Sequence, residues 1–101
     1  MVCLVGDGGL QFAAAELRTA RDEGAAVTFV VWNNAGCREI AEAMRDAGTE
    51  VIGCAPSPLD HAALAAACGL PFARVPPEAG ALTSALRAPG HGPRLIEIRA
   101  P

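Results

Sequence analysis

The stretch that decides the fold is residues 2–10, VCLVGDGGL, in which a short apolar run passes directly into a glycine-rich turn. Its first four residues are continuously apolar rather than alternating, which predicts a strand buried on both faces. Apolar residues then recur at helical spacing from Leu10 to Ala20, and Gly24 stands where a C-terminal cap belongs. This part of the chain therefore predicts a buried strand, a tight turn and one helix.

The same alternation of elements continues to the end of the chain. Further strands are predicted at residues 27–32, 72–75 and 95–98, and further helices at 36–47, 57–69 and 77–87. Strands that alternate with helices predict an α/β fold, a three-layer α/β/α arrangement with a parallel sheet. Because nothing precedes the first strand to cover it, we expect a fold that is incomplete at its N-terminus.

Two of these helices carry detailed expectations about single residues. In the helix at 36–47, Ile40, Ala43, Met44 and Ala47 are expected to share one face. In the third helix Ser57 is expected to be the cap, with Pro58 in the first turn and Asp60 in the capping-box position. His61 then falls in the first turn, where we expect it to face solvent.

Composition and charge exclude several classes of protein. The chain has 101 residues and a formal net charge of −3, without a basic cluster, so nucleic acid is not an expected partner. The longest apolar stretch, residues 25–32, is far below membrane-spanning length, and no signal peptide is evident, so we expect a cytoplasmic protein. The four cysteines form no CxxC pair, which favours free buried thiols over a metal or disulfide framework.

Two turns at predicted strand ends carry the candidate chemistry. Ligands of open α/β sheets bind beyond the carboxyl ends of the strands. The first turn, residues 6–9, has three glycines that let backbone approach a phosphate, and Asp7 would fit there if a divalent cation lay between the two anions. The second turn, residues 33–36, adds Asn oxygens, which are suitable ligands for the same cation.

Each turn alone has a plainer interpretation. A glycine turn also serves as a tight strand-to-helix connection, and asparagine favours turns for local reasons. Together, however, Gly6-Asp7-Gly8, a spacer of 24 residues and Asn33-Asn34 resemble the signature of the thiamine diphosphate-dependent enzymes. The flanking segments GGLQF (residues 8–12), VVWNNAG (30–36) and GPRLIEI (92–98) are similar to the acetolactate synthase and 2-oxo acid decarboxylase branch. The segment from Trp32 to Gly53 is most similar to 5-guanidino-2-oxopentanoate decarboxylases.

The resemblance implies a role for each residue of the two turns. Magnesium would be bound by the side-chain oxygens of Asp7 and Asn34 and by the carbonyl of Gly36. Asn33 would support its turn rather than bind metal. The residues implied to contact thiamine diphosphate or its Mg²⁺ are Gly6, Asp7, Gly8, Gly9, Asn34 and Gly36.

The resemblance also shows where this chain departs from the family. Cys37 stands where tyrosine is frequent, either as a small apolar filler or as a reactive thiol, and Glu39 is either an exposed first-turn residue or a carboxylate near the cofactor. In this family a complementary pyrimidine-binding domain, usually of another subunit, supplies an activating glutamate. Residues 1–101 are therefore expected to be a partial cofactor-binding domain of an oligomeric enzyme acting on 2-oxo acids, inactive alone, with its catalytic residues unknown. The alternatives are a phosphate- or nucleotide-binding module without catalysis, or a non-functional remnant.

Overall fold

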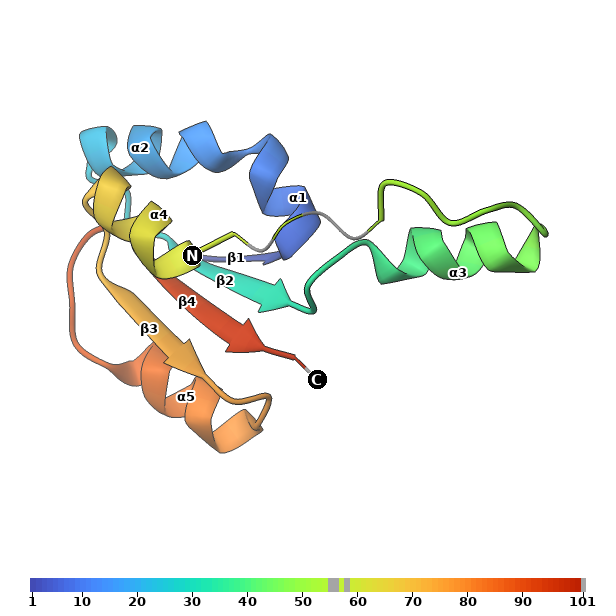
Figure 1. Ribbon diagram of the computed structural model, residues 1–101. Coiled ribbons are helices and arrows are strands. Elements are labelled where there is room, and N and C mark those ends of the chain that lie inside the picture. The colour runs from blue at the N-terminus through green and yellow to red at the C-terminus, as the bar shows by residue number, and fades with distance from the viewer. Residues whose placement is uncertain (55–56, 58, 101) are drawn as a thin grey trace.

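Four parallel strands and five helices make up the part of the chain that the structure, a computed structural model, describes, which is residues 1–54, 57 and 59–100 (Figure 1). In chain order they are β1 (Val2–Gly6), α1 (Asp7–Phe12), α2 (Ala14–Glu23), β2 (Thr28–Asn33), α3 (Arg38–Asp46), α4 (His61–Cys68), β3 (Phe72–Val75), α5 (Ala79–Arg87) and β4 (Arg94–Arg99). The predicted α/β fold with a parallel sheet is confirmed.

The sheet has the strand order β1-β2-β4-β3, and every pairing is parallel. β1 pairs directly with β2, with Gly6 opposite Trp32. The carboxyl ends of these two neighbouring strands therefore lie at the same edge of the sheet, where the chain continues into α1 after β1 and into the turn before α3 after β2 (Figure 1). This pairing brings the two predicted turns together.

Two apolar clusters, one on each face, cover the sheet. Helices α1, α2 and α4 pack on one face through Leu10, Leu17 and Ala65, which contact Val31 and Leu95 of the strands. On the other face, α5 packs on the sheet through four half-buried residues, Ala81, Leu82, Ala85 and Leu86. They pack against the buried strand residues Val30, Val75, Ile96 and Ile98. The arrangement is the predicted three-layer one, with Leu82 and Leu86 directed inward as expected.

The prediction that β1 is buried on both faces is wrong. Val2 is 58% exposed and Leu4 is 72% exposed, because β1 is an edge strand and α5 packs over β3 and β4 instead. Val5, whose side chain is on the opposite face, packs against the α1 side of the core. The cysteine prediction fails in part: all four thiols are free, but Cys3 on the edge strand β1 is exposed and only Cys54 is buried.

The starts of the helices also differ from the prediction. The first helical segment is two helices, because Ala13 leaves helical geometry at φ −120° and separates α1 from α2. α4 begins at His61 rather than at Ser57, and its cap is Asp60, whose side chain accepts a hydrogen bond from the Ala63 N–H at 3.1 Å. The expected role of Pro58 lies outside the described residues.

Helix α3 extends away from the sheet and gives the molecule its longest dimension of 48 Å (Figure 1). Ile40, on the face expected to carry the apolar residues of this helix, is exposed, and the buried residue of the helix is Ala41. No helix among the described residues is long and apolar enough to cross a membrane.

Candidate functional site

Asp7, Asn34 and Gly36 meet at the edge where β1 and β2 end. Asp7 is the first residue of α1 and is buried, although its side chain is charged. Its Oδ2 atom accepts a hydrogen bond from the backbone N–H of Gly36 at 3.0 Å. The structure thus joins the two turns, which are 29 residues apart in sequence, through the carboxylate that was predicted to bind metal.

Three oxygen atoms converge beside this hydrogen bond. As oriented in the structure, the side-chain oxygen of Asn34 lies 2.8 Å from the Gly36 carbonyl oxygen and 3.0 Å from Asp7 Oδ1. Three acceptors at this spacing repel one another unless a positive group lies among them. Turning the amide by 180° gives one such group, because the Asn34 nitrogen then donates to both other oxygens. In the other orientation of the amide, a cation placed among the three oxygens would be the positive group that satisfies them.

The spacing of these oxygens matches the coordination shell of magnesium. Mg²⁺ binds oxygen octahedrally at about 2.0–2.1 Å, so that neighbouring ligands lie about 2.9 Å apart. A carboxylate, an amide oxygen and a backbone carbonyl are also the ligand types that this cation accepts. The described residues contain no group of three or more His, Cys, Asp or Glu side chains that could hold a metal ion.

The backbone of the second turn is held in an uncommon conformation. Ala35 has φ 59° and Gly36 has φ 153°, a region that favours glycine. The Oδ1 atom of Asn33 accepts a hydrogen bond from the Ala35 N–H at 3.1 Å and stabilises the turn. The expectation that Asn33 supports the turn therefore agrees with the structure. The turn places the Gly36 carbonyl 2.8 Å from the Asn34 side chain and directs the Gly36 N–H at Asp7.

The glycines of the first turn leave space for a ligand. A Cβ atom at Gly6 would meet nothing within 4 Å, so this backbone faces open space. At Gly8 a Cβ would come within 3.2 Å of Cys37 Sγ, and at Gly9 within 3.2 Å of Val5 Cγ2. The first N–H groups of α1 also have no acceptor within the helix, which makes them available to an anion. Gly8 and Gly9 therefore allow close packing against Cys37 and Val5, and Gly6 leaves its backbone accessible to a ligand.

The six residues predicted to contact the cofactor or its Mg²⁺ line one cleft of about 320 Å³, called the cofactor cleft below. Gly6, Asp7, Gly8, Gly9, Asn34 and Gly36 border it together with Phe12, Trp32, Cys37, Arg38, Glu39 and Ile40. Cys37 and Glu39 thus both border the candidate site, and Glu39 is exposed at the start of α3. Glycine backbone that could accept a phosphate, beside oxygens of Asp7, Asn34 and Gly36 that could hold a cation, would fit a diphosphate with its magnesium ion.

A buried charged cluster at the same edge of the sheet was not predicted. Glu97 of β4 is 1% exposed, and its Oε2 lies 2.9 Å from Nδ1 of His61. Its Oε1 accepts a hydrogen bond from Arg74 Nε, also at 2.9 Å. The expectation that His61 faces solvent is wrong, because α4 begins with this residue and turns it toward β4. The signal that could have revealed the pair is a charged residue, Glu97, within the apolar run 95–98.

The pKa of Glu97 lies below its ordinary value. Burial of the carboxyl by itself raises the pKa, but the hydrogen bonds from Arg74 and His61, together with their charges, lower it by more. Glu97 is therefore ionised at neutral pH and accepts a hydrogen bond from the Nδ1–H group of His61.

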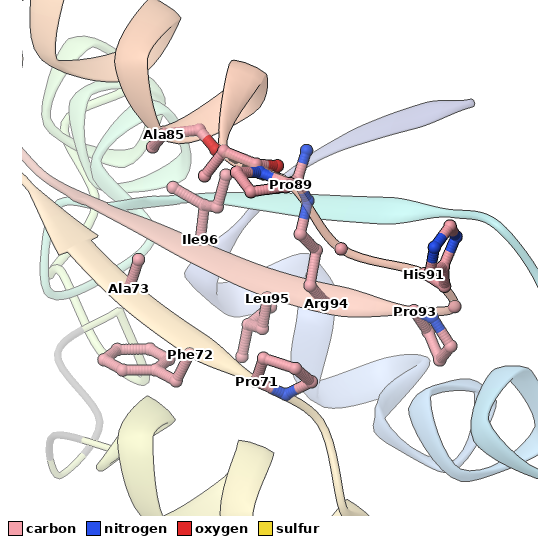
Figure 2. Close-up of a pocket in the computed structure, with 13 residues that line it drawn as sticks. Pro71, Phe72, Ala73, Ala85, Pro89, His91, Pro93, Arg94, Leu95 and Ile96 are labelled. Atoms are coloured by element: carbon pink, nitrogen blue, oxygen red, sulfur yellow. Dashed lines mark hydrogen bonds between the residues drawn. The ribbon is translucent and has the colours of Figure 1, made fainter.

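A separate cavity of about 190 Å³ lies at the opposite ends of the strands, between α5 and the starts of β3 and β4 (Figure 2). Arg94 extends across it and donates to the carbonyls of Ala85, Leu86 and Ala88 at 2.6–3.2 Å. These carbonyls lie at the C-terminal end of α5, where the last carbonyls lack the i+4 N–H donors of a regular helix. The Arg94 side chain therefore caps α5, and the cavity is a structural feature remote from the two turns.

Comparisons with known proteins agree with this geometry. The family described as "Thiamine pyrophosphate enzyme, C-terminal TPP binding domain" matches residues 1–98. Among solved structures, the Rhodococcus jostii RHA1 thiamine diphosphate-dependent 4-hydroxybenzoylformate decarboxylase is 26% identical with a TM-score of 0.83, and covers 98% of this chain and 19% of its own.

Benzoylformate decarboxylase from Polynucleobacter necessarius is similar to the same extent. It is 26% identical, has a TM-score of 0.85, and the match covers 97% of this chain and 19% of that one. The chain thus spans about a fifth of the length of these two structures. No curated protein matches the chain.

Proposed function

The chain belongs to the family of the C-terminal TPP binding domain of thiamine pyrophosphate enzymes, and on that premise we propose that it binds the diphosphate of the cofactor through Mg²⁺ held by Asp7, Asn34 and Gly36. The observation that carries the proposal is the convergence of the Asp7 carboxylate, the Gly36 carbonyl and the side-chain amide of Asn34, which lies 2.8 Å from the Gly36 oxygen and 3.0 Å from Asp7 Oδ1, beside a turn whose glycines leave backbone open to a ligand. Gly8 and Gly9 would offer backbone N–H groups to the phosphates.

The reaction we propose for the whole enzyme is decarboxylation of a 2-oxo acid. Two similar structures are named as decarboxylases of benzoylformate and of its 4-hydroxy derivative, which are 2-oxo acids. Bound thiamine diphosphate would supply the carbon nucleophile and the electron sink. The residues of this chain would anchor and orient the cofactor through its diphosphate end.

The substrate and the partners are narrower proposals. The resemblance of residues 32–53 favours 5-guanidino-2-oxopentanoate as the 2-oxo acid, with acetolactate-type carboligation as the second candidate reaction. We propose that a complementary pyrimidine-binding domain or subunit completes the site, in an oligomer. The exposed apolar side chains around the cofactor cleft, Phe12, Trp32 and Ile40, support the presence of such a partner.

A thermal-shift comparison of cofactors tests the ligand assignment. Thiamine diphosphate with Mg²⁺ should raise the melting temperature by several degrees, since a ligand at 100 times its Kd adds about 2.7 kcal/mol. Unphosphorylated thiamine should give a much smaller shift, because it lacks the diphosphate for which the cleft offers contacts. ATP and NAD carry phosphates on other ring systems and should also give smaller shifts, because the family of the chain predicts a site shaped for thiamine diphosphate.

A pair of amide variants locates the effect. Asn34→Ala removes one proposed ligand oxygen and should lose most of the cofactor-dependent shift. Gln11→Ala removes an exposed amide of α1 that does not border the cofactor cleft, and its shift should equal that of the wild type. Equal shifts for Asn34→Ala and Gln11→Ala, or a larger shift with NAD or ATP, would refute the assignment.

A further inference from the structure

A second cleft, of about 290 Å³, lies beside the cofactor cleft, and Asp7 borders both. Its other polar lining residues include Gln11, Asn33, His61 and Arg99. Of the six residues proposed to hold the diphosphate and its magnesium ion, Asp7 alone borders this second cleft within the described part of the chain. It is therefore a distinct place on the surface that the proposed function does not use.

The wall of the second cleft contains an acceptor without a donor. His61 is 1% exposed, and its Nδ1 is bound to Glu97, whereas its Nε2 has no hydrogen-bond partner among the described residues. Because Nδ1–H donates its hydrogen bond to Glu97, Nε2 is the ring nitrogen that remains to accept one. Buried polar atoms are nearly always paired, so an unpaired Nε2 next to a cleft indicates a missing donor.

The remaining groups at the cleft are mainly donors. Both oxygens of Asp7 face the Gly36 and Asn34 side of the turn, and Asn33 Oδ1 accepts from Ala35, which leaves the Asn33 NH₂ group. Arg99 adds a guanidinium whose Nε is 3.7 Å from Glu97, with most of its side chain exposed. The cleft thus offers a cation and amide donors for a ligand, and one buried acceptor at His61.

We propose that this cleft binds a small oxyanion that also carries a hydroxyl group, the chemistry shared by hydrogen phosphate and 2-hydroxycarboxylates. Its anionic oxygens accept hydrogen bonds from Arg99 and Asn33, and its hydroxyl donates to Nε2 of His61. The volume is at the lower end of the range for small-molecule sites, about 300–1,000 Å³, so the ligand is small. This inference does not depend on binding of thiamine diphosphate.

Nitrogen NMR of the imidazole rings of the full chain tests the proposal directly. The chain has two histidines, and the exposed His91, which borders the remote cavity, serves as an internal reference. Hydrogen phosphate is compared with sulfate, which has the same charge and no hydroxyl at neutral pH, and glycolate is compared with acetate. We expect saturable movement of the His61 Nε2 signal with phosphate, glycolate or both, and none with sulfate or acetate.

Two sets of variants separate binding from folding. His61→Asn keeps a donor toward Glu97 and removes Nε2, so it should weaken binding of the hydroxylated anion by about fivefold or more in a chain that still melts cooperatively. Arg99→Gln should weaken binding to a similar extent. Arg74→Gln removes an equal charge that approaches the same oxygen of Glu97 but does not border the cleft, and it should change affinity less than about twofold. The Arg99 and Arg74 variants decide the question if His61→Asn does not fold.

Equal His61 responses to phosphate and sulfate, or no response to either hydroxylated anion at tens of millimolar, would overturn the proposal. Equal losses in Arg99→Gln and Arg74→Gln would do the same, because they would assign the effect to the charge of Glu97. The fluorescence of Trp32, which borders the cofactor cleft, reports thiamine diphosphate separately. Failure at one cleft is thereby distinguished from failure at the other.

Discussion

At the scale of single residues, the orientation of one amide links the two proposed states of the cofactor site. Without a cation, Asn34 satisfies Asp7 Oδ1 and the Gly36 carbonyl by donating both amide hydrogens at 2.8–3.0 Å. With Mg²⁺, the same side chain must present its oxygen. In the proposed magnesium-bound state, two hydrogen bonds would be exchanged for three metal–oxygen contacts, and this amide would have to rotate.

The side-chain amide of Asn34 should report that rotation. In ¹⁵N-labelled protein we expect its NH₂ signals to shift strongly when thiamine diphosphate and Mg²⁺ are added together, because both hydrogen bonds are lost. Asn33, whose Oδ1 accepts from Ala35 in the same turn, is the matched control and should shift little. Similar shifts of the two amides would contradict an exchange of ligands at Asn34.

Glu97 should make stability depend on acidity. Its pKa is lower in the folded chain than in the unfolded chain, because Arg74 and His61 favour the ionised form. The unfolded chain therefore takes up the proton first, and the contribution of Glu97 to stability is present above the unfolded pKa, about 4.3, and is lost as the pH falls through the folded value. Denaturant unfolding at several pH values below about 5 measures this loss.

The variant Glu97→Gln isolates this contribution. It should be less stable than the wild type at neutral pH, and its stability should fall less steeply with decreasing pH. Parallel pH profiles for the two proteins would show that another carboxyl group is responsible.

The sequence predicts the cofactor turns better than the buried cluster. Asp7, Asn34 and Gly36 follow predicted strands, and parallel strands end at one edge, so their approach could be inferred without knowing any packing detail. The pairing of His61 with Glu97 depends on which residue caps α4. Ser57 and Asp60 are both good caps, and a shift of the start by a few residues rotates His61 from solvent to the sheet.

At the scale of elements, the turn between β2 and α3 contains stored strain. A non-glycine residue with positive φ costs roughly 1–2 kcal/mol, and Ala35 has φ 59°. Ala35→Gly relieves this cost. The greater flexibility of glycine in the unfolded chain acts in the opposite direction and destabilises the folded state by about 0.5–1 kcal/mol. We expect a net stabilisation of up to about 1 kcal/mol, which raises the melting temperature by a few degrees.

The same substitution within a helix should have the opposite sign. Ala43 is an exposed residue of α3, and Ala43→Gly should destabilise by about 0.5–1 kcal/mol if α3 is folded in the chain. Calorimetry of both variants compares them. Destabilisation by Ala35→Gly of the same size as by Ala43→Gly would contradict a left-handed conformation at Ala35.

The existence of each strand could be predicted from its apolar run, but exposure and helix limits could not. The run 2–5 predicts a strand correctly, yet its burial depends on what packs beside β1, and α5 packs elsewhere. The break at Ala13 has no glycine or proline to mark it, so one long helix was the simpler prediction. The exposure of Ile40 likewise depends on the direction in which α3 leaves the sheet.

At the scale of the whole molecule, the chain holds one end of the proposed cofactor. The carboxylates that border the cofactor cleft are Asp7 and Glu39. Asp7 is engaged with Gly36 and Asn34, and Glu39 is exposed at the start of α3. Neither is placed in a water-excluded pocket, where a carboxylate could act on the rings of the cofactor.

We therefore predict that the purified chain does not turn over 2-oxo acids, even with saturating thiamine diphosphate and Mg²⁺. Carbon dioxide release from benzoylformate, pyruvate and 5-guanidino-2-oxopentanoate should equal that of Asp7→Ala. A complementary pyrimidine-binding domain should restore turnover to the wild type and not to the variant. Release well above the variant by the chain alone, in a preparation free of host enzymes, would show that identical chains assemble a complete site.

The central claim is that Asp7 couples magnesium to the diphosphate, and the most direct measurement of it is the affinity for thiamine diphosphate with and without Mg²⁺, followed by the fluorescence of Trp32 at the cofactor cleft. In the wild type we predict that Mg²⁺ tightens binding by at least about tenfold, or about 1.4 kcal/mol. Asp22→Ala, which removes an exposed carboxylate of α2, should show the same effect. In Asp7→Ala the magnesium effect should fall below about twofold, and an equal magnesium effect in Asp7→Ala and Asp22→Ala would contradict the account.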